Sequence, residues 1–378
     1  MTPLDTVETP SLLIDAERMR ANIARMAQRI AARGSTLRPH VKTHKSADVM
    51  HEVLAAGHVT GITVSTLAEA AYFLAAGAAD ILYAVGITPN KLDQVAALQA
   101  RGADMKIILD SAAMAEAVVA KAAAMGARFK LLIELDVDSH RSGVNPQADE
   151  LMAIARILHD GAGTELMGVM THAGGAYDAS DETALRRAAA AERDLSVLAA
   201  TRLRSAGLPC PMVSIGSTPT ALSVEDLTGI TEVRAGVYTF FDLVQAGIGV
   251  CAVDDIALSV LATVIGHQAD KGWIIVDAGW MAMSRDRGTE RQAVDQGYGL
   301  VTDLDGRPLP GVIMGSANQE HGILMLRAGD PGPMPLLPVG SMVRILPNHA
   351  CATAAQHGHY HVTEQGGVTA RWERLRGW

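Results

Sequence analysis

Lys42 is the residue of this sequence best placed to act as an amine nucleophile. It lies in the run Arg38–Lys45 (RPHVKTHK), at the end of the first predicted β-strand. A lysine that points into a largely apolar cavity has a lowered pKa, because burial disfavours the charged amine, and it becomes a usable nucleophile. A solvated loop lysine is the ordinary alternative, so the case for Lys42 depends on its neighbours.

Other chemically active side chains follow later predicted strands. Arg141 and His172 lie in the runs HRSG and THAGG, after the fifth and sixth strands. In Gly216–Thr220 (GSTPT) a glycine and hydroxyl residues open a predicted short helix, which fits both an anion-binding turn and an ordinary capped turn. Arg234 and Gly236 lie on the eighth strand, and late strands commonly carry the phosphate site of a barrel enzyme.

His349 and Cys351 form an H-x-C pair within PNHACAT. On a β-strand the two side chains share one face, about 6–7 Å apart along the backbone and within reach of one ion. Imidazole and thiolate suit Zn²⁺, with two open positions for water or substrate, while Mn²⁺, Co²⁺ and Mg²⁺ remain alternatives. Such a pair also occurs by chance. A second cluster, His357–His361, alternates like the face of a solvated edge strand and could compete for metal.

The elements that must position these residues alternate between short β-rich runs and Ala-rich amphipathic segments such as Glu182–Ser205. This pattern is typical of strand and helix units around a parallel sheet, and eight such units predict a closed (β/α)8 barrel whose active site faces the C-terminal strand ends. An open doubly wound sheet ranks below it, because no G-x-G-x-x-G follows the first strand. The predicted barrel strands are Leu37–Thr43, Gly61–Thr66, Ile81–Val85, Met105–Asp110, Phe129–Asp136, Leu166–Ala173, Pro211–Ser217 and Glu232–Tyr238, with further helices at Leu67–Ala76 and Ser111–Met125.

After about residue 250 the pattern changes to β-rich segments punctuated by Gly, Pro and Asp. The predicted strands there are Ala257–Ile265, Trp273–Val276, Ser341–Leu346 and Tyr360–Thr363. We therefore expect a barrel domain over residues 17–249 and a mostly β, metal-binding domain over residues 1–16 and 250–378.

Composition restricts the class of protein. With 378 residues and 49% hydrophobic content the chain buries a large core and is not disordered. Its net charge of −9 is spread without blocks of like charge, so neither a nucleic-acid footprint nor a membrane patch is expected. Three scattered cysteines, an acidic N-terminal segment unlike a secretory leader and no apolar stretch near about 20 residues favour a cytoplasmic protein that acts on small molecules.

Nine motifs occur in one order along nearly the whole chain: TPSLLID, RPHVKTHK, HRSGV, THAGG, GSTPT, VRAGVYTFFD, VDAGW, NQEHG and PNHACAT. Through them the chain resembles the D-threonine aldolase and D-serine dehydratase-like group, relatives of alanine racemase among the fold-type III pyridoxal-phosphate enzymes. Its overall sequence resembles the hydroxyaspartate and serine dehydratases more closely than the aldolases. The resemblance implies pyridoxal 5'-phosphate on a (β/α)8 barrel, a divalent metal on a β-rich domain, and a homodimer.

The resemblance also assigns roles position by position. Lys42 matches the family lysine that carries the cofactor, Arg141 the arginine near its phenolic oxygen, and His172 the histidine against the pyridine ring. Further matches are a phosphate cradle of Gly216, Ser217, Thr218, Gly236 and Val237, with Arg234 beside the pyridine nitrogen, Tyr177 near the pocket, and the metal pair His349 and Cys351.

The metal pair is H-x-D in the aldolases and H-x-C in the dehydratases, so Cys351 favours dehydration. The expected reaction converts a D-configured β-hydroxy amino acid, D-threo-3-hydroxyaspartate or D-serine, into a 2-oxo acid and ammonia, with Lys42 removing the α-proton and the metal binding the β-hydroxyl. The alternatives are aldolase cleavage to glycine and an aldehyde, a non-catalytic pyridoxal-phosphate carrier, and a barrel enzyme with neither cofactor. Arg285 or Arg287 could receive a second substrate carboxylate or be surface charges, and Glu320-His321 lies near the pocket or in an ordinary turn.

Overall fold

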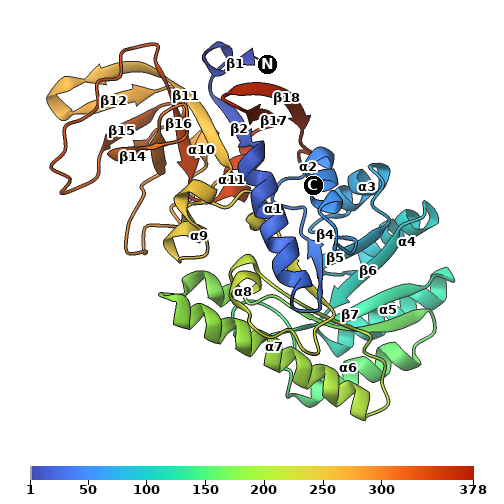
Figure 1. Cartoon of the computed structure of the whole chain (residues 1–378). Coiled ribbons are helices and arrows are strands. Elements are labelled where there is room, and N and C mark those ends of the chain that lie inside the picture. The colour runs from blue at the N-terminus through green and yellow to red at the C-terminus, as the bar shows by residue number, and fades with distance from the viewer. Residues whose placement is uncertain (1) are drawn as a thin grey trace. The chain divides into compact units, whose positions relative to one another are not determined.

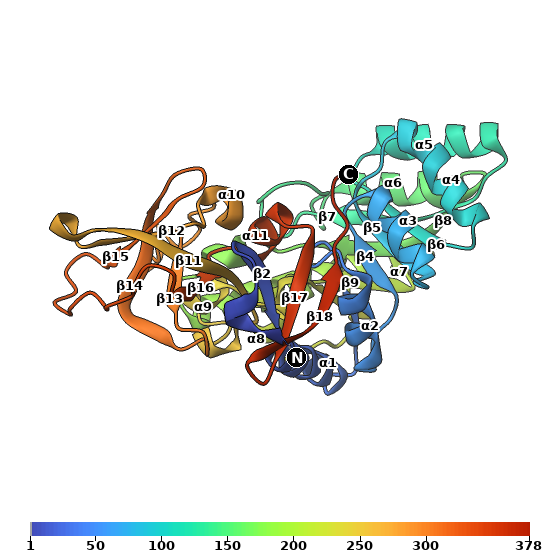
Figure 2. The ribbon, with the colours of Figure 1, turned by 90° about the horizontal axis from the view of Figure 1, so that it is seen from above.

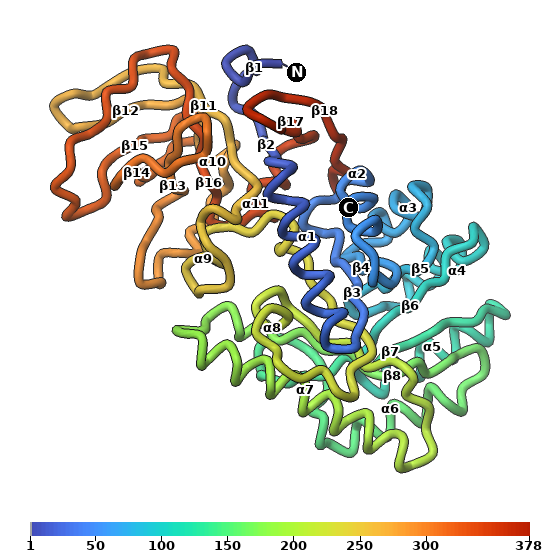
Figure 3. The backbone as a smooth tube through the Cα atoms, in the orientation of Figure 1, coloured from blue at the N-terminus to red at the C-terminus, as the bar shows by residue number. Residues whose placement is uncertain are grey.

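The computed structural model describes residues 2–378, and its backbone is traced in Figure 3. Internal contacts divide the chain into two compact units. The barrel unit comprises Arg25–Lys42, Val53–Gly236 and Gly377–Trp378. The β-rich unit comprises the chain up to Ala24, Thr43–Glu52 and Val237–Arg376.

Eight parallel strands form the sheet of the barrel unit, in the order β3-β10-β9-β8-β7-β6-β5-β4. Isolated parallel bridges, Leu37 to Val59 and His40 to Thr63, join the segments of β3 and β4 and bring the sheet close to complete closure. The predicted parallel barrel and its eight strands are confirmed. Their bounds are β3 Thr36–Pro39, β4 Ile62–Val64, β5 Asp80–Gly86, β6 Asp104–Leu109, β7 Phe129–Leu135, β8 Thr164–Thr171, β9 Met212–Ile215 and β10 Glu232–Ala235.

Helices α3 to α7 lie along the outside of this sheet (Figure 1). Local signals set their ends: α7 begins where the Asp181 side chain accepts a hydrogen bond from Ala184 N at 2.8 Å, and α5 ends at Gly126 in the left-handed region, with φ 62°. The helix predicted over Glu182–Ser205 is found with those bounds. The helices are α1 Ala16–Ala31, α2 Ala47–Ala55, α3 Leu67–Ala75, α4 Leu92–Ala100, α5 Ala112–Met125, α6 Asp149–Asp160, α7 Glu182–Ser205, α8 Thr218–Ser223, α9 Leu243–Gly247, α10 Trp280–Met283 and α11 Ala350–Gln356.

Charged side chains fill part of the barrel that aliphatic side chains would fill in a simpler core. The Arg38 side chain is 1% exposed, with Nε 2.8 Å from Glu232 Oε2 and Nη1 2.8 Å from Asp80 Oδ1. Lys106 Nζ lies 2.8 Å from the same Asp80 oxygen. Opposite charges in direct contact offset the desolvation of each group, so the network can remain buried.

The β-rich unit contains a ten-stranded sheet in the order β1-β18-β17-β2-β11-β12-β15-β14-β13-β16, with a further pairing of β11 with β16. β2, from the N-terminal end of the chain, pairs antiparallel with β11 and parallel with β17 (Figure 2). The four strands predicted after residue 250 are confirmed. The bounds are β1 Thr2–Pro3, β2 Ser11–Asp15, β11 Leu258–Gln268, β12 Trp273–Val276, β13 Gly299–Thr302, β14 Pro308–Ala317, β15 Gly322–Leu326, β16 Met342–Pro347, β17 His359–Glu364 and β18 Gly367–Glu373.

One predicted feature of this sheet is wrong. The strand that carries His359 and His361 is not an edge strand, because β17 lies between β18 and β2. The polar alternation suggested an edge, whereas the pairing partners come from distant parts of the sequence.

Within residues 2–378, no helix has the length and apolarity that crossing a membrane requires.

Candidate active site and metal pair

His172 lies at the centre of the predicted cofactor residues of the barrel unit. Its Nδ1 is 3.0 Å from the carbonyl oxygen of Gly216, and since a carbonyl only accepts, Nδ1 carries the proton and donates. Burial lowers the pKa of His172 to about 3, the carbonyl contact opposes this, and the charges of Lys42, Arg234 and Arg141 lower it further. The ring is therefore neutral at pH 7, and three of the predicted cationic residues act on the same imidazole.

Lys42 is exposed, so the burial that the sequence prediction attached to this amine is not found. Strand β3 ends at Pro39, and the residues after it form a turn that is held by a hydrogen bond from Val41 N to Thr63 O at 3.0 Å. Lys42 instead has a polar neighbour in His40. Burial is the main cause that lowers the pKa of His40 well below its usual value, and the charge of Lys42 lowers it further. Both His40 and His172 are thus neutral near this amine.

The turn Gly216–Thr220 has the predicted structure. Gly216 has φ 134°, and a β-carbon there would collide with the backbone of Arg234, so this position needs glycine. The Ser217 hydroxyl caps the short helix α8 by accepting from Thr220 N, in a capping box. The Thr218 hydroxyl, only 1% exposed as a residue, makes no hydrogen bond within the described chain. A buried donor without a partner beside a glycine turn fits the predicted phosphate of the cofactor.

Glu192 joins the two loops described above and was not singled out from the sequence. It projects from the middle of α7, is 1% exposed, and its Oε1 accepts from Ala173 N at 3.1 Å and from Gly216 N at 3.0 Å. Burial raises its pKa, against the effect of these hydrogen bonds. The only sequence signal was an acidic residue on the inner face of an otherwise Ala-rich helix.

The remaining predicted residues of the barrel unit vary in how firmly they are held. Arg234 is buried and donates to Ser214 Oγ at 2.6 Å and to the carbonyl oxygen of Thr171. Arg141 is exposed, with Nη2 3.8 Å from Glu134 Oε1, a buried carboxyl whose pKa is raised by burial. The Tyr177 ring centroid lies 6.5 Å from that of His172. Gly236 ends the barrel unit, and Val237 begins the next segment of the β-rich unit.

In the β-rich unit, His349 and Cys351 do not lie on a strand, which corrects the predicted local structure. Strand β16 ends at Pro347, His349 is the N-cap of α11, and Cys351 lies in the first turn of that helix. The backbone changes from extended to helical between the two residues. Their side chains nevertheless meet, since His349 is hydrogen bonded to Cys351. The Cys351 thiol also lies 3.3 Å from Thr43 Oγ1, in the same unit.

Asp286 completes the surroundings of His349. Its Oδ2 lies 2.7 Å from His349 Nδ1, which leaves Nε2 for another partner. Burial lowers the pKa of His349, but the hydrogen bond to Asp286 and the interaction with Cys351 raise it to about 11. This anionic environment favours a positive charge at the imidazole, either a proton or a metal ion. A carboxylate that fixes the tautomer of a histidine is also the usual outer partner of a metal ligand.

Two buried polar residues hold the backbone around this pair. Asp242 Oδ2 accepts from Ala350 N at 2.9 Å, and Asn348 Nδ2 donates to the carbonyl oxygens of Asp286 and Gly297 at 3.1 and 2.7 Å. Nevertheless, no group of three or more His, Cys, Asp or Glu side chains within residues 2–378 is arranged to hold a metal. The role of His349 and Cys351 as two metal ligands therefore stays a prediction, in which water or substrate would fill the further positions.

Of the other polar residues considered from the sequence, Arg285 is exposed and Arg287 is half-buried. Glu320 and His321 are exposed in the turn before β15. The Arg285 guanidinium packs over the Trp280 ring, 5.1 Å from its centroid, and Arg287 lies 2.9 Å from Asp295.

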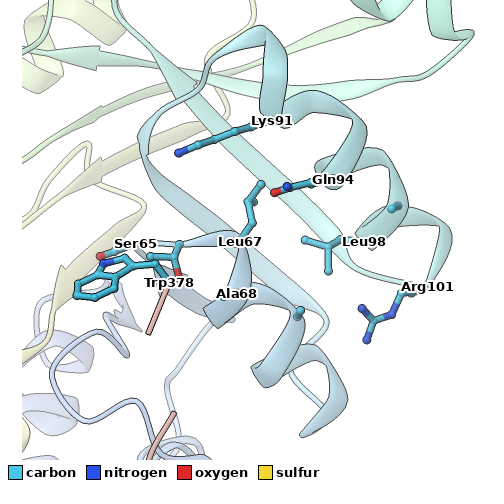
Figure 4. A pocket seen from close by; sticks show the side chains of 11 residues that line it. Ser65, Leu67, Ala68, Lys91, Gln94, Leu98, Arg101 and Trp378 are labelled. Carbon is cyan, nitrogen blue, oxygen red and sulfur yellow. The ribbon is translucent and has the colours of Figure 1, made fainter. Parts of the chain in front are cut away.

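A pocket of about 580 Å³ lies between α3 and α4 of the barrel unit. Figure 4 shows Trp378 at the same end as Ser65 and Arg101 at the opposite end. None of the predicted site residues lines this pocket, so it is separate from the predicted cofactor residues.

Comparison with known proteins shows the family. The model of "Alanine racemase, N-terminal domain" matches residues 14–244, and that of "Putative serine dehydratase domain" matches residues 257–363. The chain belongs to the alanine racemase N-terminal domain family. It is thus a member of the fold-type III pyridoxal-phosphate enzymes, with the barrel and mostly β domain expected of them.

Three relatives within this family are similar along their whole length. D-threo-3-hydroxyaspartate dehydratase of Delftia sp. (strain HT23) is 57% identical over 99% of this chain and 98% of its own, and its solved structure superimposes with a TM-score of 0.97 over 100% of both chains. D-serine dehydratase of Dictyostelium discoideum is 28% identical, covering 95% and 94%. D-threonine aldolase of an Arthrobacter species is 30% identical, covering 98% and 93%.

Solved structures of a D-threo-3-hydroxyaspartate dehydratase also include a histidine-to-alanine variant and, two positions further along that chain, a cysteine-to-alanine variant in the metal-free form.

Proposed function

We propose that this protein is a pyridoxal-phosphate- and divalent-metal-dependent dehydratase that converts a D-configured β-hydroxy amino acid into a 2-oxo acid and ammonia. The observation that carries the proposal is the end-to-end 57% identity to a D-threo-3-hydroxyaspartate dehydratase, combined with an H-x-C pair in place of H-x-D. D-threo-3-hydroxyaspartate is accordingly the first substrate to test, and D-serine the second.

The barrel residues fit the cofactor on three counts. Lys42 offers an exposed amine whose charge acts on two neutral imidazoles, His40 and His172. The Thr218 hydroxyl and the Gly216 turn offer a phosphate site. Arg234 offers a guanidinium held in one orientation by Ser214 and Thr171, suited to the pyridine nitrogen. Arg141, Tyr177, Ser217, Gly236 and Val237 keep the roles that the family resemblance gave them.

Bound pyridoxal phosphate supplies an electron sink for the charge left on Cα when the α-proton is removed. The Lys42 Nζ amine takes that proton as general base. His172, neutral and fixed through Nδ1 by the Gly216 carbonyl, presents a ring face without adding a competing positive charge. Glu192 keeps the loops of His172 and Gly216 in one geometry.

A divalent ion, Zn²⁺ in our proposal, supplies a Lewis acid that makes hydroxide a better leaving group. His349 Nε2 and Cys351 Sγ are the atoms that would hold it. Asp286 fixes the His349 tautomer by accepting from Nδ1, and the Cys351 thiolate offers a soft ligand that suits Zn²⁺. The cysteine-to-alanine variant of the relative in the metal-free form supports this choice of residues.

The test measures two product pairs separately, with purified protein, D-threo-3-hydroxyaspartate, D-serine and D-threonine as substrates, and Zn²⁺ or Mn²⁺ added. We expect 2-oxo acid and ammonia, lost on chelation and in Cys351→Ala, but not in the matched variant Cys251→Ala. Glycine plus an aldehyde would instead establish the aldolase alternative. Bound cofactor without turnover of any substrate would establish a carrier.

A second measurement locates the cofactor independently of turnover. Borohydride reduction of the holoenzyme followed by peptide mass spectrometry should place pyridoxyl phosphate on Lys42, and Lys42→Ala should abolish the visible absorbance of the bound cofactor. Lys45→Ala is the control on the same turn. Modification of Lys45 in the wild type would refute the assignment.

We further propose a cytoplasmic homodimer with domain boundaries at residues 17–249 for the barrel and 1–16 with 250–378 for the β-rich domain. Size-exclusion chromatography with light scattering tests the dimer.

A further inference from the structure

His359 and His361 lie close together on β17, apart from the residues of the proposed active site. They alternate along the strand, so both rings project from one face. Their Nε2 atoms are 3.3 Å apart, and the ring centroids are 5.0 Å apart with an interplanar angle of 72°. β17 is paired with β18 on one side and β2 on the other, which fixes the backbone beneath both rings.

The separation of the two nitrogens matches that of two ligands on one tetrahedral ion. With Zn–N bonds of about 2.0–2.1 Å and a tetrahedral angle, two imidazole nitrogens lie about 3.3–3.4 Å apart. A right-angled pair of ligands at the same bond length would lie only about 2.9 Å apart. The observed 3.3 Å therefore matches the separation that a tetrahedral ion requires of its two ligand atoms.

The two Nε2 atoms share one hydrogen bond, so an ion would take the place of the proton between them, and each neutral ring would then carry its proton on Nδ1. Burial and then the charge of Arg371 lower the pKa of His359, and burial, His359 and Arg371 lower that of His361, so both rings are neutral at pH 7. His357 lies just before β17 and is hydrogen bonded to another group, with its Nε2 2.9 Å from the Ala282 carbonyl oxygen. Glu373, opposite His359 in the ladder, lies 3.2 Å from Arg371 and offsets its charge.

We propose that His359 and His361 form a second metal site, a two-histidine chelate for a borderline transition-metal ion such as Zn²⁺ or Ni²⁺, completed by water. Two neutral ligands beside an arginine make it weaker than a site that includes a thiolate. The ion would bridge residues within one strand whose middle residue, Tyr360, donates its hydroxyl to the His44 carbonyl oxygen at 2.6 Å. Occupancy would therefore stabilise this part of the β-rich unit, since a ligand that binds only the folded state raises stability.

The site does not rest on the proposed function, and the test counts metal rather than activity. The double variant His349→Ala/Cys351→Ala, treated with chelator and titrated with Ni²⁺ or Zn²⁺ under calorimetry, should still bind one ion per chain. Adding His361→Gln should abolish that binding. Adding His267→Gln should not, because that histidine lies on β11, with its Nε2 2.8 Å from the Leu337 carbonyl oxygen.

If the double variant does not fold, the wild-type chain answers the same question. His361→Gln should lower the bound metal by one ion per chain by elemental analysis, with a loss of the metal-dependent rise in melting temperature at high Ni²⁺. No binding in the double variant, or unchanged stoichiometry in His361→Gln, would overturn the proposal.

Discussion

Replacement of Glu192 by alanine should loosen both loops that carry the proposed cofactor residues. One carboxylate oxygen accepts from Ala173 N and from Gly216 N, at 3.1 and 3.0 Å, and His172 in turn donates to the Gly216 carbonyl. The substitution leaves two buried N–H groups without partners. At about 1–3 kcal/mol for each, we predict a loss of about 2–6 kcal/mol of folding free energy.

If the proposed function holds, the same change should also weaken the binding of pyridoxal phosphate. We expect its Kd to rise by at least about tenfold, which corresponds to ~1.4 kcal/mol. Urea unfolding of the cofactor-free protein measures the first effect, and titration with pyridoxal phosphate measures the second. Glu182→Ala on the same helix is the control, because the Glu182 side chain is 76% exposed and its ion pair with Arg186 contributes little. A wild-type urea midpoint together with wild-type cofactor affinity in Glu192→Ala would refute the linking role.

Glu192→Gln separates the shape of the side chain from its charge. Burial raises the folded-state pKa of Glu192 above its unfolded value of about 4.3. The folded protein therefore holds this proton at pH values where the unfolded chain has lost it, and the stability from this residue falls as pH rises from the unfolded pKa through the folded pKa. Glutamine cannot ionise, so the variant should gain stability relative to wild type across that interval. A difference in urea midpoint that is constant with pH would contradict this sign.

Three further predictions follow from single contacts. Asp286→Asn should weaken metal binding by about 10–100-fold, because His349 loses the carboxylate that fixes its tautomer; chelator competition measures it, and unchanged affinity would exclude that role. Thr218→Val should leave the unfolding midpoint of the cofactor-free protein unchanged or raised, since the lost hydroxyl has no protein partner. The same substitution should weaken the binding of pyridoxal phosphate by about 1 kcal/mol or more. Arg38→Ala should cost about 3–5 kcal/mol in urea unfolding, because Glu232 stays buried without its cation; a loss below about 1 kcal/mol would show that water reaches Glu232.

Much of the barrel was predictable, because its signals are local. Strand and helix periods, the Ser111 and Asp181 caps and the glycine at 126 each act within a few residues. Helix α7 was accordingly predicted with the bounds it has, and all eight barrel strands were placed. The order of motifs, with H-x-C near the C-terminal end, was likewise sufficient to predict the family.

The errors fall where local pattern and long-range pairing differ. Alternating histidines suggested a solvated edge, but β17 is enclosed by β18 and β2. The H-x-C pair suggested a strand, but α11 begins between the two residues, after Pro347 ends β16. The strand predicted over Leu37–Thr43 suggested a buried amine at Lys42, but β3 ends at Pro39 and the lysine is exposed.

The sequence by itself determined the alternating elements, the barrel class and the residue types able to hold pyridoxal phosphate and a metal, since these depend on period, turn chemistry and motif order. Only the tertiary structure decided which side chains act on one another across long separations. Asp286 and His349 are 63 residues apart, and Glu192 reaches Gly216 across 24 residues. Such contacts depend on how the closed sheet and its loops bring distant backbone together, and no local preference of either residue encodes that geometry.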